Sequence, residues 1–322
     1  MSELVMRLRR NTDPAVLIAS GCVVVLLIGG SLYSPNFLSV DYLLQQLRVA
    51  SFLGIIATGS MIIILLGHID LSIPWVVTLG AMMATAAAGW WGDTGVALAI
   101  PFGVACGALV GAVSGFGVAF LRVPAMIFTL GMNAVVQGII VLHTGGFAPQ
   151  DRATETMHWI ATGTGPLGIP NALMIWLAVA AAMVFMLGRT TFGRKIYAIG
   201  NSERAAYLSG VDTRMVVLAC FAIAGACSAL GGVLLAGYAT KAYQAMGELY
   251  LLPAIAAVVL GGTHILGGKG SYFGTIVGVI LITLLQSILS VMQMPEMGRQ
   301  IIYGLVIITM LLTYGRGAKT EG

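Results

Sequence analysis

Apolar stretches long enough to cross a membrane recur along almost the whole chain. They run from residue 15 to residue 314 with only short polar breaks between them, and a transmembrane helix needs roughly 20 mostly apolar residues. Of the 322 residues, 58% are hydrophobic and only 9% are charged, and the mean hydropathy is +0.97. These values exclude a water-soluble globular protein and predict an all-α polytopic membrane protein.

The pattern predicts one transmembrane domain over residues 15–314, with short polar ends at 1–14 and 315–322. It contains about ten helices, because that many apolar runs have the length of a span. Their expected ranges are 15–33, 47–67, 73–92, 95–119, 125–144, 172–188, 214–238, 250–267, 271–292 and 299–314.

Two connections are long enough to hold structure of their own. Residues of about 145–171 are expected outside the cell, with a short helix at the membrane surface. Residues of about 189–213 are basic and expected in the cytoplasm. There, Asn201 or Ser202 can cap a short helix that Gly210 ends.

The basic residues divide unequally between the two sides of the predicted bundle. With the amino terminus inside, 12 of the 16 Lys and Arg residues are cytoplasmic, and the other side keeps only Arg48, Arg152, Lys241 and Arg299. Cytoplasmic loops are enriched in Lys and Arg, so both termini are predicted to be cytoplasmic. This distribution accounts for the net charge of +4 without a nucleic-acid partner.

The residue patterns expected of an enzyme or a nucleotide-binding protein are missing from the sequence. The stretch GTHILGGKGS at 262–271 lacks both a glycine at Thr263 and a Ser or Thr at Gly270, which a phosphate-binding loop needs. The four histidines have no metal-ligand spacing, and the four cysteines lie in apolar runs. We therefore expect no catalytic residue, metal or cofactor in this chain.

Four polar residues within or beside the apolar runs are candidates for a solute pathway. Asp70 is either a polar contact for a solute or proton, or a cap for a helix with Pro74 in its first turn. Asn133 and Gln137 are four residues apart on one helix face, and Gln286 lies in another predicted helix. Hydrogen bonds between helices would explain these three amides equally well.

Glycines at every fourth position mark one predicted helix. They leave bare backbone along one face, where another helix can approach closely. The pattern predicts helix packing rather than a pore lining, and its members are Gly103, Gly107, Gly111 and Gly115.

Several sequence blocks together resemble one family. They are GHIDLS at 67–72, LRVPAMIFTLGM at 121–132, and the run from GRKIYAIGNSERAAYLSGV at 193–211 through AIAAVVLGGTHILGGKGS at 254–271. The chain resembles the permease subunits of bacterial ABC importers for ribose, xylose, arabinose and galactose. The resemblance covers nearly the whole chain, with the blocks in the same order.

The resemblance implies a fold and a set of partners. The fold would be a cobalamin-importer-like bundle in the bacterial inner membrane, paired with a second copy or a paralogue. A periplasmic sugar-binding protein would deliver the sugar. Cytoplasmic ATPase subunits would use ATP and Mg, so this chain would bind no cofactor.

The resemblance also assigns the cytoplasmic segment 201–210 as the helix that couples to the ATPase. The residues carried over as its contact face are Glu203, Arg204, Ala205, Ala206, Leu208 and Gly210. The block at 67–72 departs from the family's GGIDLSVG, since His68 replaces a glycine and Ile73-Pro74-Trp75 follows. A different pentose, a deoxysugar or a polyol is therefore as consistent as ribose.

Two other classes of protein remain as alternatives. An ion-coupled secondary transporter has the same composition but needs buried titratable residues, for which the sequence offers only Asp70. An integral-membrane enzyme would need clustered His, Cys or carboxylate residues. The function that the resemblance implies is ATP-driven import of a monosaccharide or small polyol.

Overall fold

The computed structural model describes residues 14–33, 35–146, 151–165 and 168–317. The predicted polar ends therefore lie almost entirely outside the described residues. Every regular element within the described ranges is helical, and the only β-type pairings there are isolated bridges, Arg152 with Lys241 and Thr164 with Pro170. The prediction of an all-α protein is confirmed.

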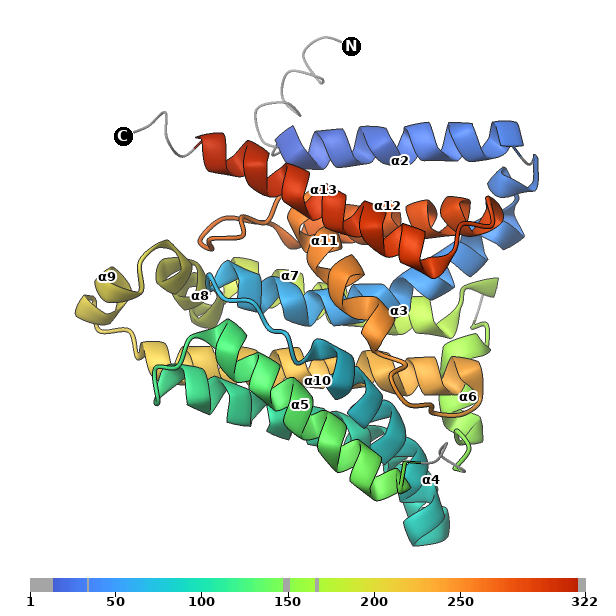
Figure 1. Ribbon diagram of the computed structural model, residues 1–322, viewed down its shortest axis with the longest axis horizontal. Helices are drawn as coiled ribbons and strands as arrows, with labels where there is room; N and C mark the ends of the chain where they lie inside the picture. Colours follow the sequence, from blue (N-terminus) through green and yellow to red (C-terminus); the bar gives the residue numbers. More distant parts are fainter. Residues whose placement is uncertain (1–13, 34, 147–150, 166–167, 318–322) are drawn as a thin grey trace.

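The helices run mostly along one direction and form a bundle (Figure 1). In chain order they are α2 (Pro14–Tyr33), η1 (Pro35–Leu38), α3 (Val40–Leu65), α4 (Ile73–Ala119), α5 (Ala125–Thr144), α6 (Glu155–Thr162), α7 (Asn171–Arg189), α8 (Thr191–Asn201), α9 (Glu203–Leu208), α10 (Thr213–Ala239), η3 (Glu248–Tyr250), α11 (Leu251–Leu260), α12 (Tyr272–Val291) and α13 (Glu296–Gly317).

Helix α3 is the centre of the bundle. Every residue from Ala50 to Leu65 is buried, and α3 packs on α7, α10, α11 and α12. Figure 1 shows α2, α12 and α13 on one side of α3 and α4 and α5 on the other. Small residues allow this packing, because a Cβ on Gly59 would lie 2.8 Å from the carbonyl oxygen of Ala224.

The predicted helices 73–92 and 95–119 are the two arms of α4, which folds back on itself. Gly92 lies between them with a φ of 55°, a left-handed conformation that glycine adopts at little cost. A Cβ on Gly95 would overlap the carbonyl oxygen of Ala87, and one on Gly103 would lie 2.6 Å from that of Gly80. The two arms therefore pack against each other as a helical hairpin.

The glycine pattern on the second arm of α4 is a packing face, as predicted. A Cβ added at Gly103 would lie against Gly80 of the first arm. Cβ atoms added at the other three glycines would lie against α10: Gly107 against Gly225, Gly111 against Phe221, and Gly115 against Leu218. The absence of side chains lets the α4 and α10 backbones approach closely.

Four predicted boundaries differ by three residues or more, among them the end of α13, which lies at Gly317 rather than 314. Helix α3 begins at Val40 instead of 47 because Ser39 caps it by accepting the Tyr42 backbone N–H at 3.3 Å. Helix α11 ends at Leu260 rather than 267. The chain then forms a turn-rich loop in which Gly262, Gly267, Gly268 and Gly270 all have positive φ. Helix α13 begins at Glu296 rather than 299.

Seven of the described helices are long and apolar enough to cross a membrane: α2, α3, α4, α5, α7, α10 and α12. The hairpin α4 accounts for two of the predicted helices, whereas α11 and α13 are not among these seven. The structure thus supports a polytopic membrane protein.

The two predicted short helices in the long connections are present. Helix α6 lies within 145–171, with Thr154 accepting the Met157 N–H at 3.2 Å as its cap. Helix α9 lies within 189–213. Figure 1 shows α8 and α9 at one end of the bundle and α6 towards the opposite end, as the prediction requires.

Candidate functional site

Helix α9 is a short exposed helix that is held firmly at both ends. The Ser202 hydroxyl accepts the Ala205 N–H at 3.3 Å and caps it, and Gly210, with a φ of 83°, turns the chain after it. The Asp212 carboxylate then caps α10 by accepting the Met215 N–H at 3.2 Å. The Ser202 cap and the turn at Gly210 agree with the expectation from the sequence, whereas the Asp212 cap was not predicted.

Helix α8 attaches α9 to the bundle. Its buried residues Ile196 and Ile199 face inward. A Cβ on Gly200 would overlap the carbonyl oxygen of Leu65, and the Asn201 amide donates to the Gly268 carbonyl at 3.4 Å. The end of α8, next to α9, therefore contacts both the end of α3 and the loop 261–271.

The six residues predicted as an ATPase-contacting face do not all point outward. Ala206 is only 4% exposed and packs on the bundle. Glu203 is exposed as a residue, and its carboxylate accepts the Thr213 hydroxyl hydrogen at 3.3 Å. Arg204, Ala205, Leu208 and Gly210 are exposed, and whether they contact an ATPase stays a prediction.

Tyr207 was missed by the sequence analysis. It is 68% exposed, and Leu208 beside it is 77% exposed. The sequence does contain a signal for it: Tyr207 and Leu208 are two large, mainly apolar side chains in a row, whereas the other four residues of the helix are charged or small. Exposed aromatic residues of this kind are enriched at protein interfaces.

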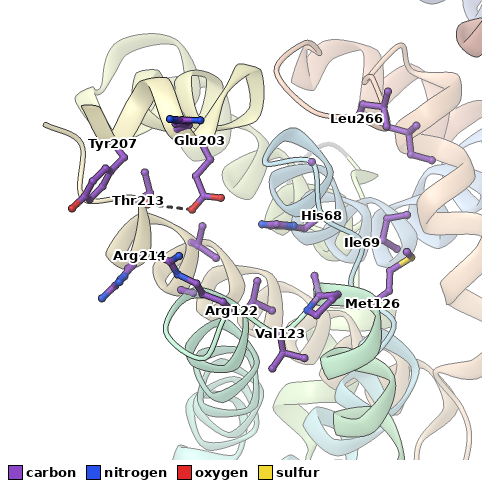
Figure 2. A pocket seen from close by; sticks show the side chains of 18 residues that line it. His68, Ile69, Arg122, Val123, Met126, Glu203, Tyr207, Thr213, Arg214 and Leu266 are labelled. Atoms are coloured by element: carbon purple, nitrogen blue, oxygen red, sulfur yellow. Dashed lines mark hydrogen bonds between the residues drawn. The ribbon is translucent and has the colours of Figure 1, made fainter. Parts of the chain in front are cut away.

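A cavity of about 880 Å³ lies behind α9 (Figure 2). It is lined by four segments distant in sequence: the α3–α4 connection with His68, the α4–α5 connection with Arg122, the region from Glu203 to Val217, and the loop residues Ile265 and Leu266. In Figure 2 the side chains of His68 and Glu203 point towards the space between them.

The cavity is predominantly basic. Arg122, Arg204 and Arg214 line it together with the single carboxylate of Glu203. The guanidinium of Arg214 lies 5.8 Å from the centre of the Phe120 ring, a cation–π contact. Burial lowers the pKa of His68, and the nearby Glu203 carboxylate opposes that shift. Arginines at this end agree with the predicted cytoplasmic side.

Asp70 lies deep in the extended segment between α3 and α4, where it is 6% exposed. One of its carboxylate oxygens accepts both the backbone N–H of Ser72 at 2.8 Å and the Ser72 hydroxyl hydrogen at 2.6 Å. The next backbone N–H, that of Leu71, donates to the Thr129 hydroxyl at 2.9 Å. Asp70 therefore holds the chain just before α4, whereas Ser72, the N-cap residue of α4, makes no side-chain capping bond. A helix cap of the expected kind is not seen, and a pathway role for Asp70 stays a prediction.

Substitutions at Asp70 separate that role from a pathway role. Asp70→Asn keeps an acceptor oxygen, so we expect wild-type stability and uptake. Asp70→Ala leaves the buried N–H and hydroxyl of Ser72 unpaired, a loss of about 1–3 kcal/mol in the free energy of unfolding. Thermal unfolding and solute uptake check this. A stable Asp70→Asn variant without uptake would instead assign Asp70 to the pathway.

The three candidate amides are not brought together. Asn133 and Gln137 lie on α5, which packs on α4, whereas Gln286 lies on α12, which packs on α2, α3 and α11. The side-chain oxygen of Asn133 is buried with no hydrogen-bond partner, and Gln137 is exposed. A shared site for all three is not supported by this arrangement, and a pathway role for each stays a prediction.

The earlier start of α3 changes the position of Arg48 within its helix. The sequence analysis expected Arg48 at the outer end of a helix at 47–67, whereas α3 begins at Val40, so Arg48 lies roughly 12 Å along it. The capping residue Ser39 is the feature that could have revealed this earlier start.

A bundle of apolar helices with a short exposed helix at one end and a cavity beside it defines a polytopic membrane protein. Residues 42–311 match the family described as the permease component of branched-chain amino acid transport systems. The match covers well over half of the chain. The chain belongs to this permease family.

The chain is also similar to individual permeases that are named for the solute they import. The chain is 35% identical over 292 residues to the ribose import permease RbsC of Haemophilus influenzae, with 90% of each chain covered. It is 33% identical over 293 residues to RbsC of Escherichia coli K12, again with 90% of each covered. It is 32% identical over 326 residues to the autoinducer 2 import permease LsrC of Salmonella typhi, covering 96% of this chain and 87% of the relative. No solved structure matches.

Proposed function

We propose that this chain is the transmembrane permease subunit of an ATP-driven importer that moves a monosaccharide or a related small polyol across the bacterial inner membrane. The observation that carries the proposal is the similarity over 90% of both chains to permeases named for ribose import. A second relative named for autoinducer 2 import is similar over most of its length. The imported solute of this chain belongs to the same small polar class.

The geometry of α9 supports coupling to a separate ATPase. Its exposed face offers Arg204, Tyr207 and Leu208 to a cytoplasmic partner. That partner binds ATP and Mg, whereas this chain supplies the contact. Helix α8 and the loop 261–271 pass the movement of α9 to the end of α3, so that the bundle alternates between two states.

The remaining partners follow from the same proposal. Both termini and α9 are cytoplasmic, which places α6 at the periplasmic end, where a sugar-binding protein docks. A second copy or a paralogue completes the complex in the lipid bilayer. An ion-coupled transporter is less well supported, because Asp70, the buried carboxylate it would use, is already engaged by Ser72.

Reconstitution tests the proposal. The chain is assembled in lipid nanodiscs with its ATPase and a sugar-binding protein, and ATP hydrolysis is measured with D-ribose, D-xylose, D-galactose and xylitol. We expect one loaded binding protein to stimulate hydrolysis, and a variant with Glu203→Ala and Arg204→Ala to lose that stimulation while the complex still assembles. Uptake driven by a proton or sodium gradient without the ATPase would overturn the proposal.

A further inference from the structure

Arg48 is a charged residue inside the central helix of a membrane bundle. The last residue of α3, Leu65, contacts Gly200 on α8, close to α9, and also contacts Gly268. Arg48 lies in the other half of α3 and is therefore remote from α9. Its side chain is partly buried. Because α3 is one of the helices able to span a membrane, a guanidinium on it is costly to place against hydrocarbon, so we expect Arg48 to face protein or water.

The partners of Arg48 are neutral. Its Nη1 donates to the Gln45 side-chain oxygen at 2.7 Å, and the Gln45 amide nitrogen donates to the Tyr238 hydroxyl at 3.1 Å. The Tyr238 ring packs on Phe52 with ring centres 5.4 Å apart. Helix α3 and the last turn of α10 are thus joined by a chain of polar contacts.

No carboxylate balances this charge. Among the described residues, the one ion pair joins Arg299 to Glu296. The Nε of Arg48 is buried without an acceptor, which is a cost that packing alone does not explain. The surroundings of Arg48 therefore carry a positive charge, and its Nε–H group is left without a hydrogen-bond acceptor.

Two further tyrosines follow Tyr238 in the chain. Tyr243 lies in the connection between α10 and η3, and Tyr250 is the last residue of η3. Tyr238 and Tyr243 are 40% and 45% exposed. This end of the bundle therefore presents aromatic faces next to an amide and a guanidinium.

The connection that carries Tyr243 is strained and held in place. Thr240 and Ala245 have φ values of 65° and 60°, a left-handed conformation that is unfavourable for such residues and common at functional sites. The Gln244 amide donates to the Thr144 hydroxyl at 2.8 Å, and the Gly247 N–H donates to the Thr78 hydroxyl at 3.2 Å. These contacts fix the connection against α4 and α5.

We propose that Gln45, Arg48 and Tyr238 form a subsite for a neutral polyhydroxylated solute in the periplasmic half of the pathway. The guanidinium and the amide donate to hydroxyl oxygens, and the Tyr238 ring packs on the C–H face of the sugar. The fixed positive charge repels cations. The inference rests on the proposed function and adds the residues that contact the solute.

Accessibility of single cysteines tests whether this subsite is aqueous and binds sugar. Cys22, Cys106, Cys220 and Cys227 are first replaced by serine or alanine, and Tyr238→Cys is then introduced into the permease–ATPase complex in nanodiscs. A charged, membrane-impermeant thiol reagent should label position 238. At least one of the four sugars named above should slow labelling by about threefold or more, because an occupied site is shielded.

The matched control is Val25→Cys on α2, a residue that is 67% exposed on the outside of the bundle. It should remain unlabelled because it faces lipid. Failure of the reagent to label position 238, or labelling at one rate with every sugar, would overturn the subsite. Both outcomes are measured without the binding protein, so they do not depend on its docking.

A second measurement separates a solute contact from a structural role. Arg48→Gln should lower the sugar carried per ATP hydrolysed by about tenfold, with Arg48→Lys recovering part of it. Unchanged sugar per ATP in Arg48→Gln would contradict the inference. Absence of stimulation in the wild-type complex would instead contradict the proposed function.

Discussion

Replacing Leu208 by aspartate is expected to remove binding of the ATPase almost completely. The side chain is 77% exposed at the tip of the bundle, and burying a leucine at an interface contributes about 1.5–3 kcal/mol. A carboxylate in the same pocket adds a desolvation cost. We expect binding to weaken by roughly 100-fold or more, measured by titrating the ATPase onto the permease in nanodiscs, with a parallel loss of sugar-stimulated ATP hydrolysis.

The permease itself should be unaffected by this change. Leu208 makes little contact with the bundle, so the unfolding temperature of Leu208→Asp should equal that of the wild type. Leu208→Met conserves volume and polarity and should bind the ATPase normally. Tight binding by Leu208→Asp would show that the ATPase does not contact this face of α9.

Gly225→Leu is expected to lower the thermal stability of the permease strongly. A Cβ at this position would overlap the carbonyl oxygen of Gly107 and would lie 3.0 Å from the Cα of Gly111. Both obstacles are backbone atoms of α4, which cannot rotate away as a side chain can. Overpacking of this kind costs about 1–3 kcal/mol or more, equivalent to a fall in unfolding temperature of roughly 5–10 °C.

The measurement is thermal unfolding in detergent, followed by the fluorescence of the buried Trp176 and the other tryptophans. Gly138→Leu on α5 is the matched control, because a Cβ there meets nothing within 4 Å. It should unfold within about 2 °C of the wild type. Equal losses in both variants would mean that leucine destabilises these helices by a mechanism other than the contact between α4 and α10.

Several elements could be predicted closely because their patterns are local. The expected helix 125–144 coincides with α5, and the expected helix 172–188 differs from α7 by one residue at each end. The short helix between Ser202 and Gly210 follows from a capping residue and a terminating glycine. Each of these depends on neighbours within a few positions in the chain.

The start of α3 could not be predicted from hydropathy. Its first turns contain Asp41, Gln45 and Arg48, which resemble a polar connection when they are considered alone. They are helical because Ser39 caps the first turn and because Gln45 finds Tyr238, a residue almost 200 positions later, as a partner. A hydropathy value gives the polarity of a side chain but does not show which distant residue will form a hydrogen bond with it.

The sequence by itself determined the class of protein, most of the apolar helices and the glycine face that packs α4 on α10. Only the tertiary structure decided that Ala206 faces inward, that four distant segments enclose the cavity behind α9, and that Gln286 lies apart from Asn133. Hydropathy and glycine spacing are properties of adjacent turns, whereas these arrangements depend on contacts between segments that have no common local pattern.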